Sequence, residues 1–306
     1  MYPAYSKLKL AQNALQHWHS RKVVRNAILV DLASVKLKIL VIGGGRMGNA
    51  FIEGLSHSAE NQIHVVEPNS SVKAKLKIDF DVTVSNYDDP EKQMGEIIPL
   101  CEYVLLCVKP QVFNKIKKTL KNFLSDNQIV ISIMAGISTD NLCEGLGIKN
   151  VIRVMPNTPG QIGKGISVWY KKNKIDFKFE EGINNILSAL GEFEEVYEEE
   201  IIDKATAISG SGPGYIFYFM ESMLKSCKEI GIDENLSKKL IIKTFLGSAE
   251  LAKFSEKDFE ELKKEVTSPN GTTEAGLKTM TENNLGNAII LGIKSAYKRA
   301  MELNND

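Results

Sequence analysis

Short apolar runs alternate with amphipathic stretches along most of the chain. The first run, residues 37–42, ends at a cluster of glycines and precedes a helix-length stretch from Arg46 to about Ser58. Further β-rich runs follow at 63–67, 82–84, 103–108, 129–133, 151–155 and 166–170. Strands that alternate with helices are joined by right-handed crossovers and form a mostly parallel sheet with helices on both faces. The pattern predicts a doubly wound α/β domain over residues 37–200, ending in an acidic edge strand near 192–200.

The pattern changes after residue 200, where no further β-rich run is visible. Five segments carry the spaced apolar residues of helices: 200–208, 212–231, 234–254, 273–282 and 286–303. Two of them, 234–254 and 286–303, are apolar on more than one side, which suggests that they bury surface against a partner copy as well as their own chain. Residues 201–306 are therefore predicted to form an all-α domain that packs against a second copy, in a homodimer or a larger assembly.

The first 36 residues differ from both halves. They carry six basic residues and one acidic residue, with apolar residues at helical intervals. A mitochondrial transit peptide has this character, and so has an extension upstream of a bacterial start site. The longest uninterrupted apolar run, Ala27–Val30, is far short of the roughly 20 residues that cross a bilayer, so no membrane anchor is expected. We set residues 1–36 apart as a basic leader and expect a cytoplasmic protein, with the mitochondrion as the alternative if the leader is a transit peptide.

Composition disfavours several classes of protein. Of the 306 residues, 43% are hydrophobic and 25% are charged, which is typical of a packed globular protein. The 38 basic and 38 acidic residues cancel, so no overall positive field favours a nucleic acid or an anionic membrane as partner. The four cysteines form no CxxC pair, and the four histidines all precede Glu67, which disfavours disulfide frameworks, metal sites and histidine-dependent hydrolases. No bound metal is expected.

A glycine-rich turn carries the first candidate chemistry. Residues 43–48 read G-x-G-x-x-G directly after a strand and at the start of a helix. In a Rossmann unit the first glycine makes the turn, the second lets backbone amides approach a pyrophosphate, and the third lets helix and strand pack closely. The next strand ends in Glu67, at about the distance where such units place the acid that binds the ribose. A structural turn and a solvated glutamate are the alternatives, but the two features together favour a nicotinamide dinucleotide.

Glu67 also bears on which nicotinamide cofactor is used. A carboxylate beside the adenosine ribose accepts a hydrogen bond from the 2′-hydroxyl and repels a 2′-phosphate, so Glu67 favours NADH over NADPH. Lys73 and Lys75 lie on the helix that follows and can partly offset that repulsion. Both cofactors therefore stay open, with NADH preferred.

Four further stretches are unusual: 107–111 (CVKPQ), 153–159 (RVMPNTP), 209–215 (SGSGPGY) and 266–276 (VTSPNGTTEAG). Each alone has a structural explanation, and for 209–214 close helix packing is the favoured one. Together and in this order they resemble the 1-pyrroline-5-carboxylate reductase family, from about Leu37 to the C-terminus. The family's V-T-S-P-G-G-T-T-x-A-G-L appears with Asn270 for its first glycine, and its S-G-S-G-P-A-Y appears with Gly214 for alanine. Asparagine suits position 270 if the backbone there has a positive φ.

The resemblance implies which residues bind the cofactor. The pyrophosphate would contact Ile42, Gly43, Gly44, Gly45, Arg46 and Met47, the adenosine ribose Glu67, and the adenine Asn86. The nicotinamide ribose would lie along Cys107, Val108, Lys109, Pro110, Ile133, Met134 and Ala135. At Glu265 the chain departs from relatives that carry an asparagine in contact with the cofactor, so the resemblance assigns no cofactor contact to Glu265.

For the substrate, the resemblance implies NADH- or NADPH-dependent reduction of 1-pyrroline-5-carboxylate to L-proline, the last step of proline biosynthesis. Ser268, Thr272 and Thr273 match the loop that grips the substrate carboxylate, and Glu199 matches a residue beside the proline site. Thr273 would hold the ring nitrogen by a hydrogen bond, and Glu199 would supply negative potential. Residues 268–273 lead into a predicted helix, whose free N–H groups and hydroxyls can bind a carboxylate, although the residues alone favour an ordinary Ser/Thr cap.

The two reactants would meet only where the two domains join, because the carboxylate loop lies in the helical half and the glycine turn in the α/β half. In a dimer with exchanged helices, as the resemblance implies, the loop of one chain would face the cofactor of the other.

Two alternative functions stay open. Another two-domain dehydrogenase would need a catalytic lysine, and Lys204, Lys225 and Lys243 lack an accompanying motif. A non-catalytic NAD-sensing or scaffold protein would have no need of a second anion site.

Overall fold

Each predicted β-rich run forms a strand in the computed structural model of the protein, which describes residues 36–85 and 90–303. The strands are β1 (Lys38–Ile42), β2 (Gln62–Val66), β3 (Thr83–Val84), β4 (Tyr103–Leu106), β5 (Ile129–Ser132), β6 (Val151–Met155), β7 (Gly165–Lys171) and β8 (Gly191–Glu195). The helices between them are α2 (Arg46–Leu55), α3 (Ser70–Asp79), α4 (Pro90–Ile97), α5 (Pro110–Phe123), α6 (Thr139–Leu146) and α7 (Glu180–Ser188). Short 3-10 turns lie at η2 (Ile98–Leu100), η3 (Thr158–Ile162) and η4 (Phe177–Phe179).

The strands form one eight-stranded sheet in the order β3-β2-β1-β4-β5-β6-β7-β8. Neighbouring strands from β3 to β6 are parallel, because helices cross over between them. The link from β6 to β7 contains only η3 and no crossover helix, and this pair is antiparallel. The acidic strand β8 lies at the edge, as predicted, and is parallel to β7. A mostly parallel, doubly wound sheet is thus confirmed.

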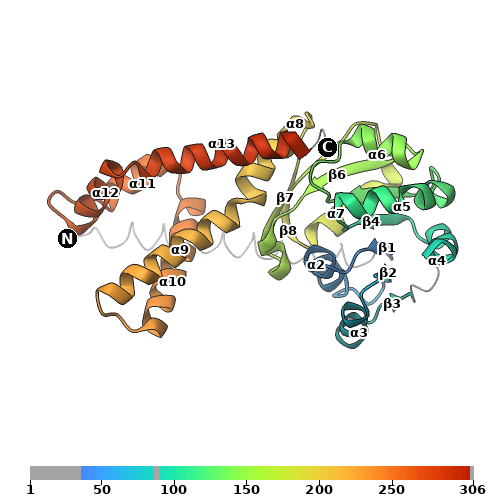
Figure 1. Ribbon diagram of the computed structural model, residues 1–306, viewed down its shortest axis with the longest axis horizontal. Coiled ribbons are helices and arrows are strands. Elements are labelled where there is room, and N and C mark those ends of the chain that lie inside the picture. Colours follow the sequence, from blue (N-terminus) through green and yellow to red (C-terminus); the bar gives the residue numbers. More distant parts are fainter. Residues whose placement is uncertain (1–35, 86–89, 304–306) are drawn as a thin grey trace, which may run out of the picture.

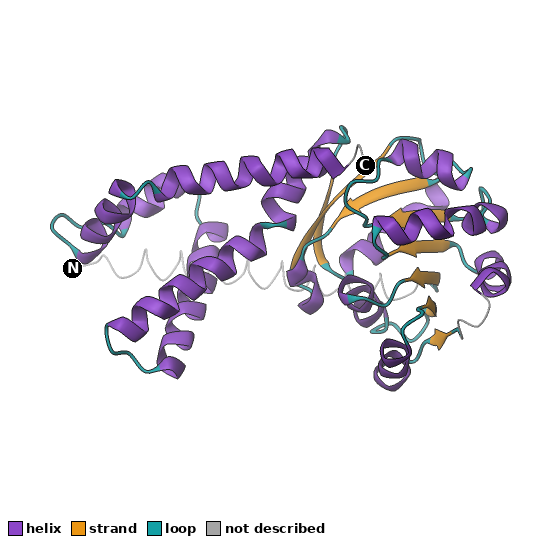
Figure 2. Ribbon diagram, in the orientation of Figure 1, coloured by secondary structure: helices purple, strands orange, loops and turns teal. Residues whose placement is uncertain are grey.

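The sheet separates two apolar cores, because alternate residues of a strand point to opposite faces. On β1, Ile39 and Val41 belong to the core that includes α2, α3 and α7, whereas Leu40 and Ile42 belong to the core that includes α4, α5 and α6. Figure 2 shows helices covering the strands on both sides. Burial on both faces explains why the strands read as continuous apolar runs instead of alternating ones.

After residue 200 the chain forms a helical arm that extends away from the sheet (Figure 1). Its elements are α8 (Glu200–Ala205), a π-helical turn η5 (Thr206–Gly210), α9 (Gly212–Glu229), α10 (Glu234–Phe254), α11 (Phe259–Glu265), α12 (Thr272–Glu282) and α13 (Leu285–Leu303). The long helices agree with the prediction. Two features differ: the first predicted helix passes into the π-helical turn, and α11 was not expected.

The arm leaves much apolar surface uncovered within one chain. Helices α9, α11 and α12 contain no buried residue, and Phe254 and Phe259 are 80% and 82% exposed. A Cβ at Gly212 or Gly214 would meet no atom of the same chain within 4 Å, whereas one at Gly210 would lie 3.5 Å from Met155 Sδ, so the explanation of residues 209–214 by close helix packing stays a prediction. Among the described residues, none of the helices is both long enough and apolar enough to cross a membrane.

Candidate active site

The predicted cofactor residues gather along one edge of the sheet. Gly43, Glu67, Cys107 and Ile133 follow directly after β1, β2, β4 and β5, which are neighbours in the sheet. Backbone bonds continue the ladder past the strand ends: Gly43 N donates to Val66 O (2.9 Å), Cys107 N to Ile42 O (2.9 Å) and Ile133 N to Leu106 O (3.2 Å). Between β1 and β4 the strand order reverses. Open α/β sheets bind their ligands in the crevice at such a switch point.

The glycine turn has the geometry of a pyrophosphate site. Gly43 has a φ of 100°, which L side chains rarely adopt, and a Cβ at Gly48 would lie 1.9 Å from Gly43 O. Both positions therefore require glycine. Helix α2 starts at Arg46 with Gly45 as its N-cap, and no side chain caps it. Gly45 and Arg46 are exposed, so the positive end of the helix is open to an anion.

Glu67 connects the glycine turn to the next helix. Its side chain is buried, and Oε2 accepts a hydrogen bond from Gly44 N (2.7 Å) while Oε1 accepts one from Asn69 N (2.8 Å). Asn69 in turn caps α3 through Ser71 N and Val72 N. A carboxylate has about four acceptor sites, so two remain for a ribose hydroxyl. The bond to Gly44 is not predicted by the sequence, and it gives Glu67 a structural role in the turn besides its predicted one.

The nicotinamide side of the edge is formed by the segments after β4 and β5. Cys107 is half-buried, and burial raises the pKa of its thiol to about 12, so it stays a neutral thiol at physiological pH. Lys109 is exposed and is the N-cap of α5, which starts at Pro110. The other predicted residues here, Val108, Ile133, Met134 and Ala135, lie on the same two segments. Asn86, predicted near the adenine, falls outside the described residues.

The predicted carboxylate loop leads directly into α12. Asn270 has a φ of 61°, so the predicted left-handed conformation is confirmed. Gly271 is the N-cap, its N–H donates to Ser268 O (3.0 Å), and no side chain caps the helix. The alternative of an ordinary Ser/Thr cap is therefore wrong, and the N-terminal amides beside Thr272 and Thr273 are not taken by a capping side chain. One feature was not foreseen: Asn270 N donates to Glu274 Oε2 (2.8 Å).

Within one chain, this loop lies far from the cofactor edge. Helix α12 and the loop before it are at the end of the arm opposite to the sheet (Figure 1). One chain therefore brings the predicted cofactor residues together at the sheet. It also brings Ser268, Thr272 and Thr273 together at the tip of the arm, but these two groups of residues lie far apart. This arrangement agrees with the expectation that the reactants meet only between chains.

Glu199 lies with the sheet and not with the carboxylate loop. Its Oε1 accepts hydrogen bonds from Thr139 N (2.7 Å) and Arg153 Nη1 (3.2 Å), and its Oε2 accepts one from Thr139 Oγ1 (2.6 Å). Arg153 Nη2 also donates to Asp203 Oδ1 (2.6 Å). The carboxylate of Glu199 thus stands at the N-terminus of α6, against a buried guanidinium.

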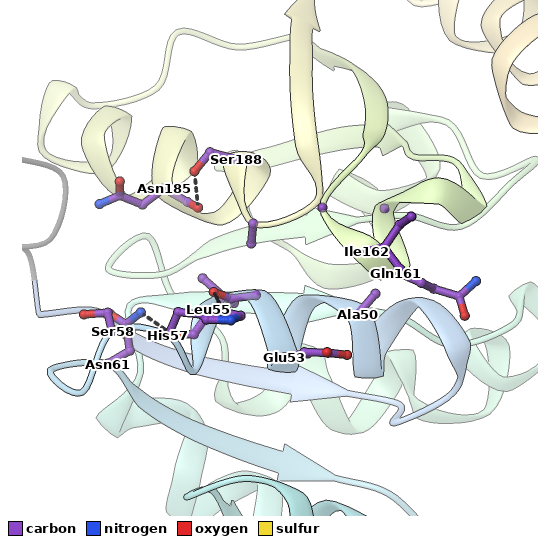
Figure 3. Close-up of a pocket in the computed structure, with 14 residues that line it drawn as sticks. Ala50, Glu53, Leu55, His57, Ser58, Asn61, Gln161, Ile162, Asn185 and Ser188 are labelled. Atoms are coloured by element: carbon purple, nitrogen blue, oxygen red, sulfur yellow. Dashed lines mark hydrogen bonds between the residues drawn. The ribbon is translucent and has the colours of Figure 1, made fainter. Parts of the chain in front are cut away.

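Two of the cavities formed by the described residues lie near the sheet, and neither contains the predicted site as a whole. One, of about 660 Å³, lies between α2, η3 and α7 and borders the C-terminal half of α2, away from the glycine turn (Figure 3). It contains none of the predicted residues. The other, also about 660 Å³, reaches Pro110 and Ala135 from the side of α5 and α6 and is bordered by Arg299 and Leu303 of α13. Among the described residues, no group of three or more His, Cys, Asp or Glu side chains could hold a metal ion.

Comparison with known proteins identifies the family. Residues 199–303 match a family model described as pyrroline-5-carboxylate reductase dimerisation, and residues 38–136 match one described as NADP oxidoreductase, coenzyme F420-dependent. The pyrroline-5-carboxylate reductase of Pseudomonas aeruginosa is 34% identical over 271 residues, which cover 87% of this chain and 96% of the relative. The chain belongs to the pyrroline-5-carboxylate reductase family. The reductase of Synechocystis is 33% identical and covers 88% of this chain and 99% of its own length.

Solved structures of pyrroline-5-carboxylate reductases have the same fold. The Coxiella burnetii enzyme is 30% identical, with a TM-score of 0.76 over 88% of this chain and 99% of that chain. The Plasmodium falciparum enzyme, solved with NADP bound, is 26% identical, with a TM-score of 0.78 over 88% of this chain and 98% of that chain. These matches confirm the resemblance drawn from the four motifs, and they confirm a Rossmann-type α/β half followed by a helical half.

The buried cluster around Arg153 is the main feature of this reductase that the sequence does not predict. In the sequence, Arg153 stands out only as the first residue of the motif 153–159. An arginine in the middle of an apolar strand is a signal that its charge is paired, because an unpaired buried charge is very costly. Its partners Glu199 and Asp203 are 46 and 50 residues away in the sequence, so the spacing gives no indication of the pairing.

Proposed function

We propose that the chain reduces 1-pyrroline-5-carboxylate to L-proline with a reduced nicotinamide dinucleotide. The observation that carries the proposal is the 34% identity over 87% of the chain, because the match spans both the cofactor edge and the carboxylate loop. A cofactor sensor would need only the first of these. The geometry of both parts supports the same reaction.

The cofactor would bind across the strand ends, with its pyrophosphate at the turn from Ile42 to Met47. Open amides at the start of α2 suit the phosphates, and Glu67 suits a ribose 2′-hydroxyl. The segments 107–110 and 133–135 would line the nicotinamide ribose. We propose a preference for NADH, because the charge of Glu67 opposes a 2′-phosphate; NADP is bound in the Plasmodium falciparum relative.

The substrate carboxylate would bind at the uncapped N-terminus of α12. The N–H groups of the first turn and the hydroxyls of Ser268, Thr272 and Thr273 provide donors there, and the helix dipole favours an anion at this end. No cationic side chain is required. The same loop would hold the five-membered ring so that its C=N carbon faces the cofactor edge of a partner chain.

When bound, the reduced nicotinamide supplies the hydride, and the protein supplies orientation. A protonated imine accepts hydride faster, because its carbon is more electrophilic, so the site must hold a ring nitrogen that carries a proton. Thr273, a half-buried residue at the start of α12, is proposed to position this nitrogen through its hydroxyl. Glu199 is proposed to act through its negative potential, because its oxygens accept three hydrogen bonds from its own chain, which hold the carboxylate in place.

The active unit is proposed to be a homodimer, or a larger assembly built from it. Support comes from the match of residues 199–303 to a dimerisation family and from the exposed apolar helices of the arm. In this arrangement residues 37–200 form the cofactor domain, and residues 201–306 form the substrate and dimerisation domain. We propose a cytoplasmic location, with the mitochondrion as the alternative if residues 1–36 act as a transit peptide; those up to residue 35 lie outside the described part of the chain.

The test is to follow the loss of reduced-nicotinamide absorbance with 1-pyrroline-5-carboxylate and each cofactor in turn. We expect turnover with NADH, and a Thr273→Ala variant should lose about 10-fold or more in kcat/KM, since it removes a bond to the reacting ring. Thr281→Ala is the matched control, because Thr281 lies two turns later on α12 and its hydroxyl only bonds Leu277 O (2.8 Å). No turnover with either cofactor would contradict the proposal.

A further inference from the structure

Arg153 is the most buried charge among the described residues of the sheet. It lies in the middle of β6, with its side chain 1% exposed, and faces α8 from the strand. Its two terminal nitrogens hold two carboxylates at the start of the arm: Glu199, the N-cap of α8, at 3.2 Å, and Asp203 on α8, at 2.6 Å. A planar guanidinium forks between two acceptors in a fixed geometry, which an ammonium group cannot reproduce. The pair therefore fixes the orientation of α8 on the sheet.

Glu199 also links α8 to the loop after β5. Both of its oxygens bind Thr139, the first residue of α6, through the backbone N–H (2.7 Å) and the hydroxyl (2.6 Å). A carboxylate at this position also interacts favourably with the positive end of α6. Residues 133–138 connect β5 to Thr139, and their first part belongs to the proposed nicotinamide side of the site. One carboxylate thus joins the base of the arm to the end of that loop.

The C-terminal end of the arm, at the end of α13, contacts the same loop. A Cβ at Gly136, whose φ is 74°, would lie 2.5 Å from Leu303 O, so the last turn of α13 packs directly on the loop backbone. Tyr297 of α13 donates a hydrogen bond to Glu200 Oε1 (2.6 Å) on α8. The first and last helices of the arm are therefore joined to each other, and both contact the segment 133–139.

We propose that Arg153 is a positioning residue for the reaction: by holding Glu199 against Thr139, it fixes the arm relative to the nicotinamide side of the cofactor edge. This inference rests on the proposed function, because it requires that the arm carries the substrate loop to the edge of a partner chain. Small displacements at the base of the arm become larger at its tip, where residues 266–273 lie (Figure 1). The cofactor contacts of the glycine turn are on other strands and do not depend on Arg153.

The experiment compares full-length wild type with Arg153→Lys and Thr139→Val. Arg153→Lys keeps the charge but loses the fork, and Thr139→Val removes only the hydroxyl bond to Glu199. The matched control is Lys172→Met, which breaks the exposed ion pair to Asp140, the residue after Thr139 on α6. For each protein we measure kcat, the KM for 1-pyrroline-5-carboxylate, the dissociation constant of NADH, the isotope effect with NADH deuterated at C4, and the thermal midpoint.

For Arg153→Lys we expect kcat to fall by about 10- to 100-fold, with a larger isotope effect, because misplaced reactants slow hydride transfer itself. Binding of NADH should stay within about twofold of wild type, since the glycine turn is untouched. Thr139→Val should change kcat in the same direction by less, and the double variant should be less than additive, because both act through Glu199. Lys172→Met should match wild type.

A lower thermal midpoint with unchanged kcat and isotope effect in Arg153→Lys would assign Arg153 to stability alone and overturn the inference. Equal losses in NADH binding and kcat would also overturn it. If Arg153→Lys does not fold, the same measurements on Thr139→Val test the inference: unchanged kcat and isotope effect with a lower thermal midpoint would overturn it. Failure of the wild type to turn over would instead overturn the proposed function, so the two failures are distinguishable.

Discussion

Replacement of Glu67 tests the cofactor edge and the cofactor preference together. Glu67 is 8% exposed, and its carboxylate accepts hydrogen bonds from Gly44 N (2.7 Å) and Asn69 N (2.8 Å). Glu67→Gln keeps one oxygen acceptor and removes the charge. Glu67→Ser removes both carboxylate oxygens and leaves the two backbone donors without their partner. The two variants therefore separate the effect of charge from the effect of the hydrogen bonds.

The size of the charge effect follows from electrostatics. Two like unit charges 4 Å apart repel by about 4 kcal/mol at an effective dielectric constant of about 20. Solvent and salt around an exposed phosphate reduce this to about 1–2 kcal/mol, which is on the order of 5- to 30-fold in a ratio of rates. We expect Glu67→Gln to raise the ratio of kcat/KM for NADPH to that for NADH by about tenfold. Glu67→Ser should also lose about 1–3 kcal/mol of stability for each orphaned donor.

The assay is steady-state oxidation of each cofactor at saturating 1-pyrroline-5-carboxylate, with thermal unfolding of each variant. Glu102→Gln is the control, because Glu102 is exposed and precedes β4, at the opposite edge of the sheet. It should leave the ratio unchanged. A Glu67→Gln enzyme with the wild-type ratio refutes the electrostatic reasoning, and a Glu67→Ser enzyme with wild-type stability refutes the structural role of the bond to Gly44.

Three further predictions concern the turn at Asn270, the core around β4 and the sharing of sites. Asn270→Gly should keep stability and activity, whereas Asn270→Ala should cost about 1–2 kcal/mol in thermal unfolding, because alanine tolerates a φ of 61° poorly. Burial raises the pKa of three groups in or beside β4 to about 12: Cys101, Tyr103 and Cys107. Their ordinary values are 9.0, 10.0 and 9.0, so they ionise first in the unfolded chain, and the free energy of unfolding should fall as pH rises from about 9 to about 12. Urea titrations across that range measure this, and a flat profile contradicts it. Mixing equal amounts of Thr273→Ala and Gly45→Glu chains should restore about a quarter of wild-type activity, because half the dimers are mixed and each has one intact site. Gly45 has open space beside it, so this variant should fold, and no recovery at any ratio argues against shared sites.

Local patterns were sufficient to predict most of the fold. The period and length of the apolar runs predicted the positions of the strands and the long helices. A strand that is buried on both faces of a parallel sheet is a short continuous apolar run, which is easily told from the longer amphipathic pattern of a helix. The requirement for glycine at Gly43 and Gly48 and the positive φ at Asn270 also follow from local backbone chemistry, and the structure confirms them. Strand direction is different: the residues of β7 themselves do not show that it runs antiparallel to β6, and only the short link without a crossover helix indicates it.

Features that depend on distant contacts were not predicted. Arg153 meets carboxylates that follow two further strands and helix α7, and no sequence period connects them. The π-helical turn η5 packs against α13, a helix that lies about 80 residues later in the sequence, and a pattern of local residues cannot anticipate that contact. Helix α11 was missed because it has only seven residues, although Asp258 and Glu261 form a capping box that is a recognisable start signal.

The two halves of the chain depend on assembly to different degrees. The α/β half has two closed cores, and its strand ends form the cofactor edge within one chain. The arm has helices with no buried residue, and the carboxylate loop lies at its tip. Cofactor binding should therefore need one folded chain, and substrate binding two. Because a ligand stabilises the state that binds it by RT ln(1 + [L]/Kd), proline with NAD should shift dilute protein toward dimers in sedimentation velocity, whereas NAD alone should not. An equal shift with NAD alone would mean that the cofactor edge itself spans two chains.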